Sequence, residues 1–178
     1  MLKHYLSKAR KEGWAIGQFN FSTIEQLKAI VEASLKLKAP VILGTSKGES
    51  SFFGINEAAI IVSFYKKKYK APIFLNLDHG KNIEIIKNAI DSGYDMVHFD
   101  GSKMDIKDNI QITGEVIKYA RKKGVLVEGE VGYIPGRSAL HKGKAESSDL
   151  ITAKDAIDFA TKTKTDLLAV SVGNIHGV

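Results

Sequence analysis

The chain of 178 residues is long enough for one domain with a hydrophobic core, and its 44% hydrophobic and 26% charged residues are typical of a water-soluble globular protein. It contains no cysteine, which excludes disulfides and thiolate metal sites, so any metal ion must bind to His, Asp or Glu. No apolar run approaches the roughly 20 residues of a membrane span, and the N-terminus lacks the apolar core of a signal peptide. We therefore expect a cytoplasmic protein with no membrane partner.

The formal net charge of +6 lies largely in lysine-rich clusters, such as residues 66–68 and 121–123. Both clusters lie near the ends of predicted helices, where cations interact favourably with the helix dipole. Because no nucleic-acid recognition motif accompanies this charge, we expect no nucleic-acid partner.

Helical apolar spacing alternates with short apolar runs along the whole chain. The expected elements of the first half are a helix over Leu2–Lys11, a strand over Ala15–Phe19, a helix capped by Ser22 or Thr23, a strand over Val41–Gly44, a helix over Ile55–Tyr69 and a strand over Ile73–Leu77. Those of the second half are a helix over Ile83–Asp91, a strand over Met96–Phe99, a helix over Ile106–Lys123, a strand over Val125–Val131, a helix over Ala153–Thr163 and a strand over Asp166–Val172.

These predicted strands are continuously apolar, which indicates a parallel sheet buried on both faces and built from right-handed βα units. Two folds remain open: a doubly wound sheet and a (β/α)₈ barrel, which needs about 250 residues and eight strands. No glycine-rich phosphate loop follows the first strand. Polar residues end several strands, and only a barrel turns all of them toward one centre. We therefore predict an α/β TIM barrel, incomplete with about six of its eight units, as a single domain over residues 1–178.

Two strand ends carry side chains suited to chemistry. The apolar run Ala71–Leu77 stops at Asp78, His79 and Gly80, and the last predicted strand is followed by His176. Carboxylates transfer protons, and imidazoles with carboxylates match a zinc site of nitrogen and oxygen ligands. The polar residues expected to converge are Asn20, Ser46, Asp78, His79, Asp100, Glu128, Glu130 and His176.

Six motifs in order resemble the class II (zinc-dependent) fructose-bisphosphate aldolases, a family that includes tagatose-bisphosphate aldolases. The motifs are Gln18-Phe19-Asn20, Leu37–Ser46, Leu77-Asp78-His79-Gly80, Phe99-Asp100-Gly101-Ser102, Glu128–Gly132 and Gly173–Val178. Each motif alone is weak, but their order through nearly the whole chain makes the resemblance specific.

The resemblance implies a metal centre and a catalytic acid. His79 and His176 match two of the three zinc-binding histidines of the family. Asp100 and Glu130 match acids that hold a second or alternative divalent metal. Asp78 matches the acid that protonates the aldehyde oxygen during condensation and removes that proton during cleavage.

The resemblance also implies a phosphorylated sugar substrate. Asn20 and Ser46 match substrate-binding residues, and Gly177 matches a glycine at the triose-phosphate group. The implied reaction is the metal-dependent, reversible cleavage of fructose 1,6-bisphosphate to dihydroxyacetone phosphate and glyceraldehyde 3-phosphate, by a lyase that forms a dimer or tetramer. A tagatose bisphosphate is the alternative substrate. No lysine lies inside a predicted strand, so a Schiff-base mechanism has no candidate residue.

Two departures from the family pattern leave a second hypothesis open. The family has an acidic pair in the loop after the fifth strand, where this chain has Gly136–Lys142, so His141 and Glu146 are the substitute candidates for the base. The family also continues past the position of Val178 with two more units and the third zinc histidine. The alternative is therefore a non-catalytic barrel fragment that binds metal or phosphate, and we expect the chain by itself to be inactive.

Three positions within the predicted strands carry a carboxylate or an imidazole. Glu128 and Glu130 alternate onto the same side of their strand, so at least one of them should meet a metal or a cation. His98 lies in the middle of a strand, where we expect it to pack or form hydrogen bonds rather than bind metal.

Overall fold

A computed structural model describes residues 1–134 and 150–173. Their strands form one parallel sheet whose spatial order follows the chain, from β1 to β6. The strands are β1 Gly17–Asn20, β2 Val41–Thr45, β3 Ile73–Gly80, β4 Met96–Phe99, β5 Leu126–Val131 and β6 Leu167–Val170. A doubly wound sheet reverses its strand order at a switch point. The unbroken order therefore confirms the prediction of a partial barrel of six βα units and excludes the doubly wound alternative.

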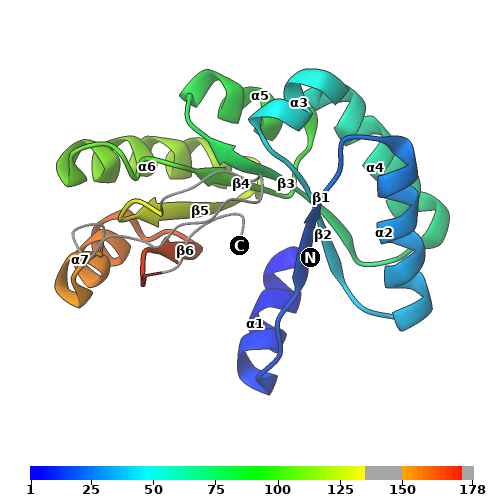
Figure 1. The fold of residues 1–178 in the computed structure, drawn as a ribbon, viewed down its shortest axis with the longest axis horizontal. Helices are drawn as coiled ribbons and strands as arrows, with labels where there is room; N and C mark the ends of the chain where they lie inside the picture. The colour runs from blue at the N-terminus through cyan, green and yellow to red at the C-terminus, as the bar shows by residue number, and fades with distance from the viewer. Residues whose placement is uncertain (135–149, 174–178) are drawn as a thin grey trace.

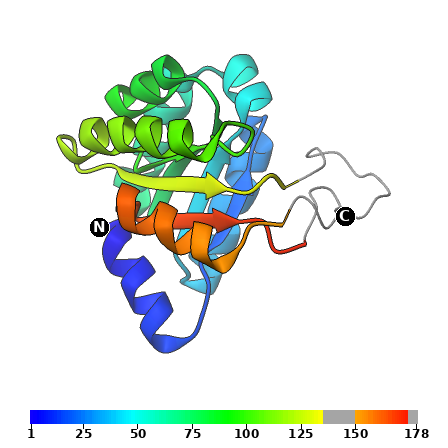
Figure 2. The ribbon, with the colours of Figure 1, turned by 90° about the vertical axis from the view of Figure 1, so that its left-hand side faces the viewer.

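Helices α2 to α7 cover the outer face of this curved sheet, whereas α1 lies at the opposite side, beside its concave face (Figures 1 and 2). The helices are α1 Leu2–Glu12, α2 Ile24–Leu37, α3 Lys47–Phe53, α4 Ile55–Tyr69, α5 Ile83–Ser92, α6 Ile106–Arg121 and α7 Ala153–Thr163. Thr23 is the N-cap of α2. None of these helices in the described residues is long and apolar enough to cross a membrane.

Helix α3 was not predicted from the sequence. It follows directly after β2, and the backbone N–H of Ser46 donates to Glu49 Oε2 at 2.5 Å, which closes its first turn. Ser46, predicted to bind substrate, therefore lies at the start of a helix at the carboxyl end of the sheet.

Alternation along the strands separates two hydrophobic cores. The larger core fills the space between the sheet and the outer helices, and includes Leu43, Leu75 and Val97. The smaller core, formed with Leu2 of α1, lies on the inner face of the sheet; it contains Leu2, Ile42, Phe74, Met96 and Leu126. The next inner positions along β3, β4 and β5 are Asn76, His98 and Glu128. The inner face is thus apolar near the amino ends of the strands and polar toward their carboxyl ends.

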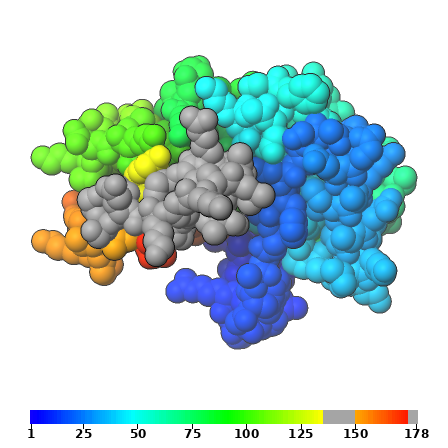
Figure 3. All heavy atoms as spheres, in the orientation of Figure 1, coloured from blue at the N-terminus to red at the C-terminus, as the bar shows by residue number. Residues whose placement is uncertain are grey.

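Strands β1 and β6 are the edges of the sheet, each with one neighbour among the described strands. Phe19 on β1 is 55% exposed and Val172, just after β6, is 76% exposed. Between these edges a cavity of about 520 Å³ opens on the inner face, and its lining includes Arg10 of α1 and Leu167 of β6. A notch separates α1 (dark blue) from α7 (orange) on this side in the space-filling view (Figure 3). That residues 1–178 form a single domain stays a prediction.

Candidate metal and catalytic site

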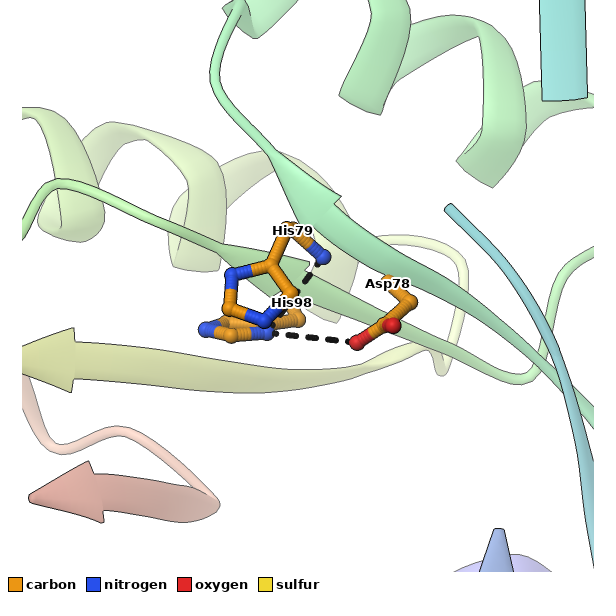
Figure 4. A group of neighbouring side chains, drawn as sticks. All are labelled: Asp78, His79 and His98. Carbon is orange, nitrogen blue, oxygen red and sulfur yellow. Dashed lines mark hydrogen bonds and ion pairs between the residues drawn. The ribbon is translucent and has the colours of Figure 1, made fainter. Parts of the chain in front are cut away.

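The end of β3 departs from regular strand geometry, and this departure places the central residues of the site. Successive side chains of a strand face opposite sides, so Asp78 and His79 should diverge. His79 instead has a left-handed backbone (φ 53°), and the register with β4 shifts between Leu77 and Gly80. Both side chains reach the same site, with ligand atoms of Asp78, His79 and His98 within 4.8 Å of one another (Figure 4). A left-handed non-glycine residue costs about 1–3 kcal/mol and is concentrated at functional sites.

The shift in register between Leu77 and Gly80 is a β-bulge, and Gly80 lets it pack closely against its neighbours. A Cβ atom at this position would lie 2.8 Å from Ile86 Cγ1 and 3.1 Å from the carbonyl oxygen of His98. The absent side chain therefore lets the end of β3 pack against β4 and α5, which fixes where His79 points.

The imidazole of His79 faces two carboxylates from neighbouring strands. Its Nδ1 lies 3.1 Å from Asp100 Oδ2 and 3.5 Å from Glu130 Oε2. Ser102 Oγ donates to Asp100 Oδ1 at 2.6 Å, and Lys81 Nζ lies 3.2 Å from Asp100 Oδ2. Burial alone would raise the pKa of Asp100, but hydrogen bonds from His79 and Ser102 and the charge of Lys81 hold it well below its usual range. The bond to Asp100 raises the pKa of His79, against the opposing effect of burial.

His98 lies beneath His79, with ring centroids 4.6 Å apart. The backbone N–H of His79 donates to His98 Nδ1 at 3.4 Å. Asp78 Oδ1 lies 3.7 Å from the same Nδ1, and Glu130 Oε2 lies 3.1 Å from Nε2. Burial would lower the pKa of His98, but the neighbouring Asp78 and Glu130 raise it to about 10. The sequence predicted that His98 packs or forms polar contacts; it does, and these contacts lie inside the candidate site.

Asp78 is held by a residue from the edge strand. Asn20 Nδ2 on β1 donates to Asp78 Oδ2 at 2.9 Å. Burial would raise the pKa of Asp78, but His98 and Asn20 stabilise the carboxylate and lower it. Asp78 is therefore ionised at neutral pH and suited to accept a proton.

The predicted site residues divide into three groups. Those that the structure brings together are Asn20, Asp78, His79, Asp100 and Glu130. Glu128 also lines the inner cavity, and burial raises its pKa. Ser46 lies at the carboxyl end of β2, but no hydrogen bond joins it to this cluster within the described part of the chain. The residues that lie outside the described residues are His141, Glu146, His176 and Gly177.

The cluster fits a divalent metal ion. His79, Asp100 and Glu130 offer one nitrogen and two oxygen ligand atoms within 4.8 Å of one another. Glu130 is 2% exposed, and its Oε2 is buried without a hydrogen bond. A buried polar atom with no hydrogen bond costs about 1–3 kcal/mol, and a carboxylate oxygen beside an imidazole is a normal ligand pair for zinc. The residues present therefore match the chemistry of a metal centre.

Comparisons with known proteins agree with this arrangement. A fructose-bisphosphate aldolase of Giardia intestinalis is 36% identical over 177 residues, which cover 99% of this chain and 54% of that protein. A fructose-bisphosphate aldolase of Staphylococcus epidermidis is 34% identical, with 99% of this chain and 62% of that protein covered. The crystal structure of the YdjI aldolase from Escherichia coli K12 superposes with a TM-score of 0.86 at 26% identity, over 98% of this chain and 62% of that one.

The chain thus spans between about half and two thirds of the length of these relatives. The sequence model of a whole family, described as "Fructose-bisphosphate aldolase class-II", matches residues 1–178. The chain belongs to the class-II fructose-bisphosphate aldolase family.

Proposed function

We propose that the protein containing this chain is a metal-dependent aldolase that reversibly cleaves fructose 1,6-bisphosphate to dihydroxyacetone phosphate and glyceraldehyde 3-phosphate. One observation carries the proposal: an ionised Asp78 lies directly beside a cluster of metal-ligand type, His79, Asp100 and Glu130, at the carboxyl ends of the strands. In barrels of this kind, chemistry takes place at those strand ends. The relatives named as fructose-bisphosphate aldolases support the choice of substrate.

His79, Asp100 and Glu130 are the residues that would hold the ion, together with His176 as the resemblance implies. The donor set of nitrogen and oxygen without sulfur supports zinc. A bound divalent ion supplies stabilisation of the negative charge that develops on the ketone oxygen of the substrate. As the resemblance implies, Asp100 and Glu130 would also be the acids that hold a second or alternative divalent metal, beside His79.

Asp78 performs the proton transfer in this proposal. As the bond between carbons 3 and 4 breaks, its carboxylate takes the proton of the hydroxyl on carbon 4, and that oxygen becomes the aldehyde oxygen. In the condensation direction the same proton returns to the aldehyde oxygen. Asn20 holds one carboxylate oxygen in place, which orients the other toward the reacting hydroxyl. Asn20, Ser46 and Gly177 would contact the substrate.

A second candidate is a metal- or phosphate-binding barrel piece without turnover. Two observations favour it for residues 1–178 alone: β1 and β6 each have one neighbour among the described strands, and the chain covers only 54% and 62% of the relatives' lengths. The homo-oligomer and the cytoplasmic location implied by the resemblance remain predictions, as does the identity of the loop base.

Cleavage rates separate the two candidates. The protein that contains this chain and the chain of residues 1–178 are each incubated with zinc and fructose 1,6-bisphosphate, and triose phosphate release is followed by coupled oxidation of NADH. We expect turnover at or above about 1 s⁻¹, the low end for ordinary enzymes, for the whole protein and none for the chain alone. Absence of cleavage by the whole protein, with zinc bound, would refute the aldolase proposal.

A further inference from the structure

Lys81 brings a cation into the candidate site from the short connection between β3 and α5. The backbone is fixed on both sides of this residue. On one side, the N–H of Asp100 donates to the carbonyl oxygen of Gly80 at 3.0 Å. On the other side, Asn82 is the N-cap of α5 and accepts from the backbone N–H of Glu84. Lys81 therefore starts directly beside Asp100, and its Nζ lies 3.2 Å from Asp100 Oδ2.

Both oxygens of Asp100 are already in use. A carboxylate offers roughly four acceptor positions on its two oxygens. Oδ1 accepts from the hydroxyl of Ser102 at 2.6 Å and from the backbone N–H of the same residue at 3.3 Å. Oδ2 lies 3.1 Å from His79 Nδ1 and 3.2 Å from Lys81 Nζ. One ion beside His79 can share Asp100 with these partners, whereas a second ion has to displace Lys81 or Ser102.

We propose that Lys81 takes the place of a second divalent ion at Asp100, so that the site holds a single ion. The inference rests on the proposed function in so far as that function needs a metal. The resemblance to the family implies a second or alternative ion at Asp100 and Glu130. The ammonium of Lys81 excludes the second ion, and Asp100 keeps its place beside the one ion that His79 helps to hold.

Electrostatic repulsion supports this exclusion. An ion bound to Asp100 Oδ2 at the usual zinc–carboxylate distance of about 2.0–2.2 Å lies within about 5.4 Å of Lys81 Nζ, because both contact the same oxygen. The side chain of Asp100 is only 6% exposed, so water and salt screen this repulsion incompletely. The ammonium supplies a compact positive charge but no coordination position. The ion at His79 then remains the single Lewis acid of the site.

Zinc stoichiometry tests the proposal on the protein that contains this chain. The metal-free protein and its Lys81→Gln, Lys81→Arg and Lys107→Gln variants are titrated with zinc in competition with a chromophoric chelator. The side chain of Lys81 is 58% exposed, so Lys81→Gln removes the charge without opening a cavity in the core. Lys81→Arg keeps the charge. Lys107 is an exposed lysine in the first turn of α6 and gives the matched control.

We expect one equivalent of zinc per chain in the parent protein, in Lys81→Arg and in Lys107→Gln. In Lys81→Gln a second equivalent should bind at least about 10-fold more tightly than in the parent protein, because repulsion between a divalent ion and one charge at this distance has that size even in water. Two equivalents bound equally well by the parent protein and by Lys81→Gln would overturn the proposal, as would a single equivalent in both.

A measurement on the unmutated protein covers the case in which Lys81→Gln does not fold. The metal-free protein is loaded with an excess of Mn²⁺, the unbound ion is removed, and the electron paramagnetic resonance spectrum is recorded. The six-line signal of an isolated ion supports the proposal, and spin coupling between neighbouring ions refutes it. A protein that binds neither zinc nor Mn²⁺ would refute the metal-dependent function as well, whereas a pair of bound ions would refute only this inference.

Discussion

Asn20 reaches across β2 to Asp78, so that the edge strand of the sheet holds the proposed catalytic carboxylate at an Nδ2–Oδ2 distance of 2.9 Å. The contact is possible because β2, the strand between them, has a glycine at the position that Asn20 crosses. Gly44 of β2 is paired with Asn20, and a Cβ atom there would lie 1.9 Å from Asn20 Oδ1.

Gly44→Ala should therefore displace Asn20 and lower turnover of the whole protein while zinc content stays unchanged. The loss of one oriented contact to a catalytic group predicts a decrease in kcat of about 10–100-fold, because small misplacements cost that much. Gly114→Ala is the matched control, since nothing lies within 4 Å of the corresponding Cβ position. Turnover of Gly44→Ala equal to that of Gly114→Ala would show that Asn20 does not position Asp78.

Asp78 and His79 should have separable roles. Asp78→Asn removes the proton acceptor but keeps the shape, so kcat should fall by about 10²–10⁴-fold, the usual contribution of a general acid or base, with zinc retained. His79→Gln removes an imidazole that faces Asp100 and Glu130, so zinc and activity should be lost together. Elemental analysis beside cleavage rates measures both effects, and equal zinc loss in the two variants would contradict the division.

Tyr94 should make the free energy of unfolding vary with pH in the alkaline range. Its hydroxyl is 3.0 Å from Thr45 Oγ1 in the core, and burial raises its pKa to about 12, against the lowering effect of that hydrogen bond. An unfolded tyrosine ionises near pH 10, so between about pH 10 and 12 the unfolded state loses its proton while the folded state keeps it. The free energy of unfolding should therefore fall as pH rises through this window.

Tyr94→Phe should remove this pH dependence and cost about 1 kcal/mol at pH 7, the typical net value of a hydrogen bond. Urea unfolding at pH 7 and pH 11 measures both effects. Tyr69→Phe, at a partly exposed tyrosine of α4, is the control. An equal loss of stability between the two pH values in the parent protein and in Tyr94→Phe would refute the assignment.

The edge at β1 should make residues 1–178 associate at high concentration. An apolar cavity of about 640 Å³ lies between β1 and α2, and Phe19 and Leu37 in its lining are 55% and 74% exposed. Exposed strand edges with apolar surface promote association. Leu37→Lys should shift the chain toward the monomer in sedimentation velocity, whereas Ile60→Lys, at a 71% exposed residue of α4, should not. A parent chain that stays monomeric at high concentration would contradict this expectation.

Much of the fold could be predicted from local patterns. Continuous apolar runs indicated each of the six strands, because parallel strands buried on both faces are apolar at nearly every position. Apolar residues at helical spacing between these runs indicated most of the helices. Helix α3 was missed because residues 47–53 are mostly small or polar and their helical turn depends on the Ser46–Glu49 contact. The sequence also ended the first strand at Phe19, although Asn20 is part of β1.

The candidate site was predictable in its members but not in its geometry. Strand ends indicated Asp78, His79, Asp100 and Glu130, and the structure brings these four together. Alternation would have sent His79 outward; the bulge and left-handed backbone that turn it inward depend on the packing of Gly80 against β4. The spacing of two residues puts His98 on the same face as Met96. Because β4 is apolar on both faces, the sequence pattern could not show that this face is the inner one.

Chelation of the whole protein tests the account most directly. Metal is removed with a chelator, zinc is added back, and cleavage of fructose 1,6-bisphosphate is measured at each step, in the parent protein and in Asp78→Asn. We predict loss of cleavage with the metal, recovery with zinc in the parent protein, and no recovery in Asp78→Asn. Cleavage that persists after complete metal removal, or that recovers equally in Asp78→Asn, would contradict a metal-dependent aldolase in which Asp78 moves the proton.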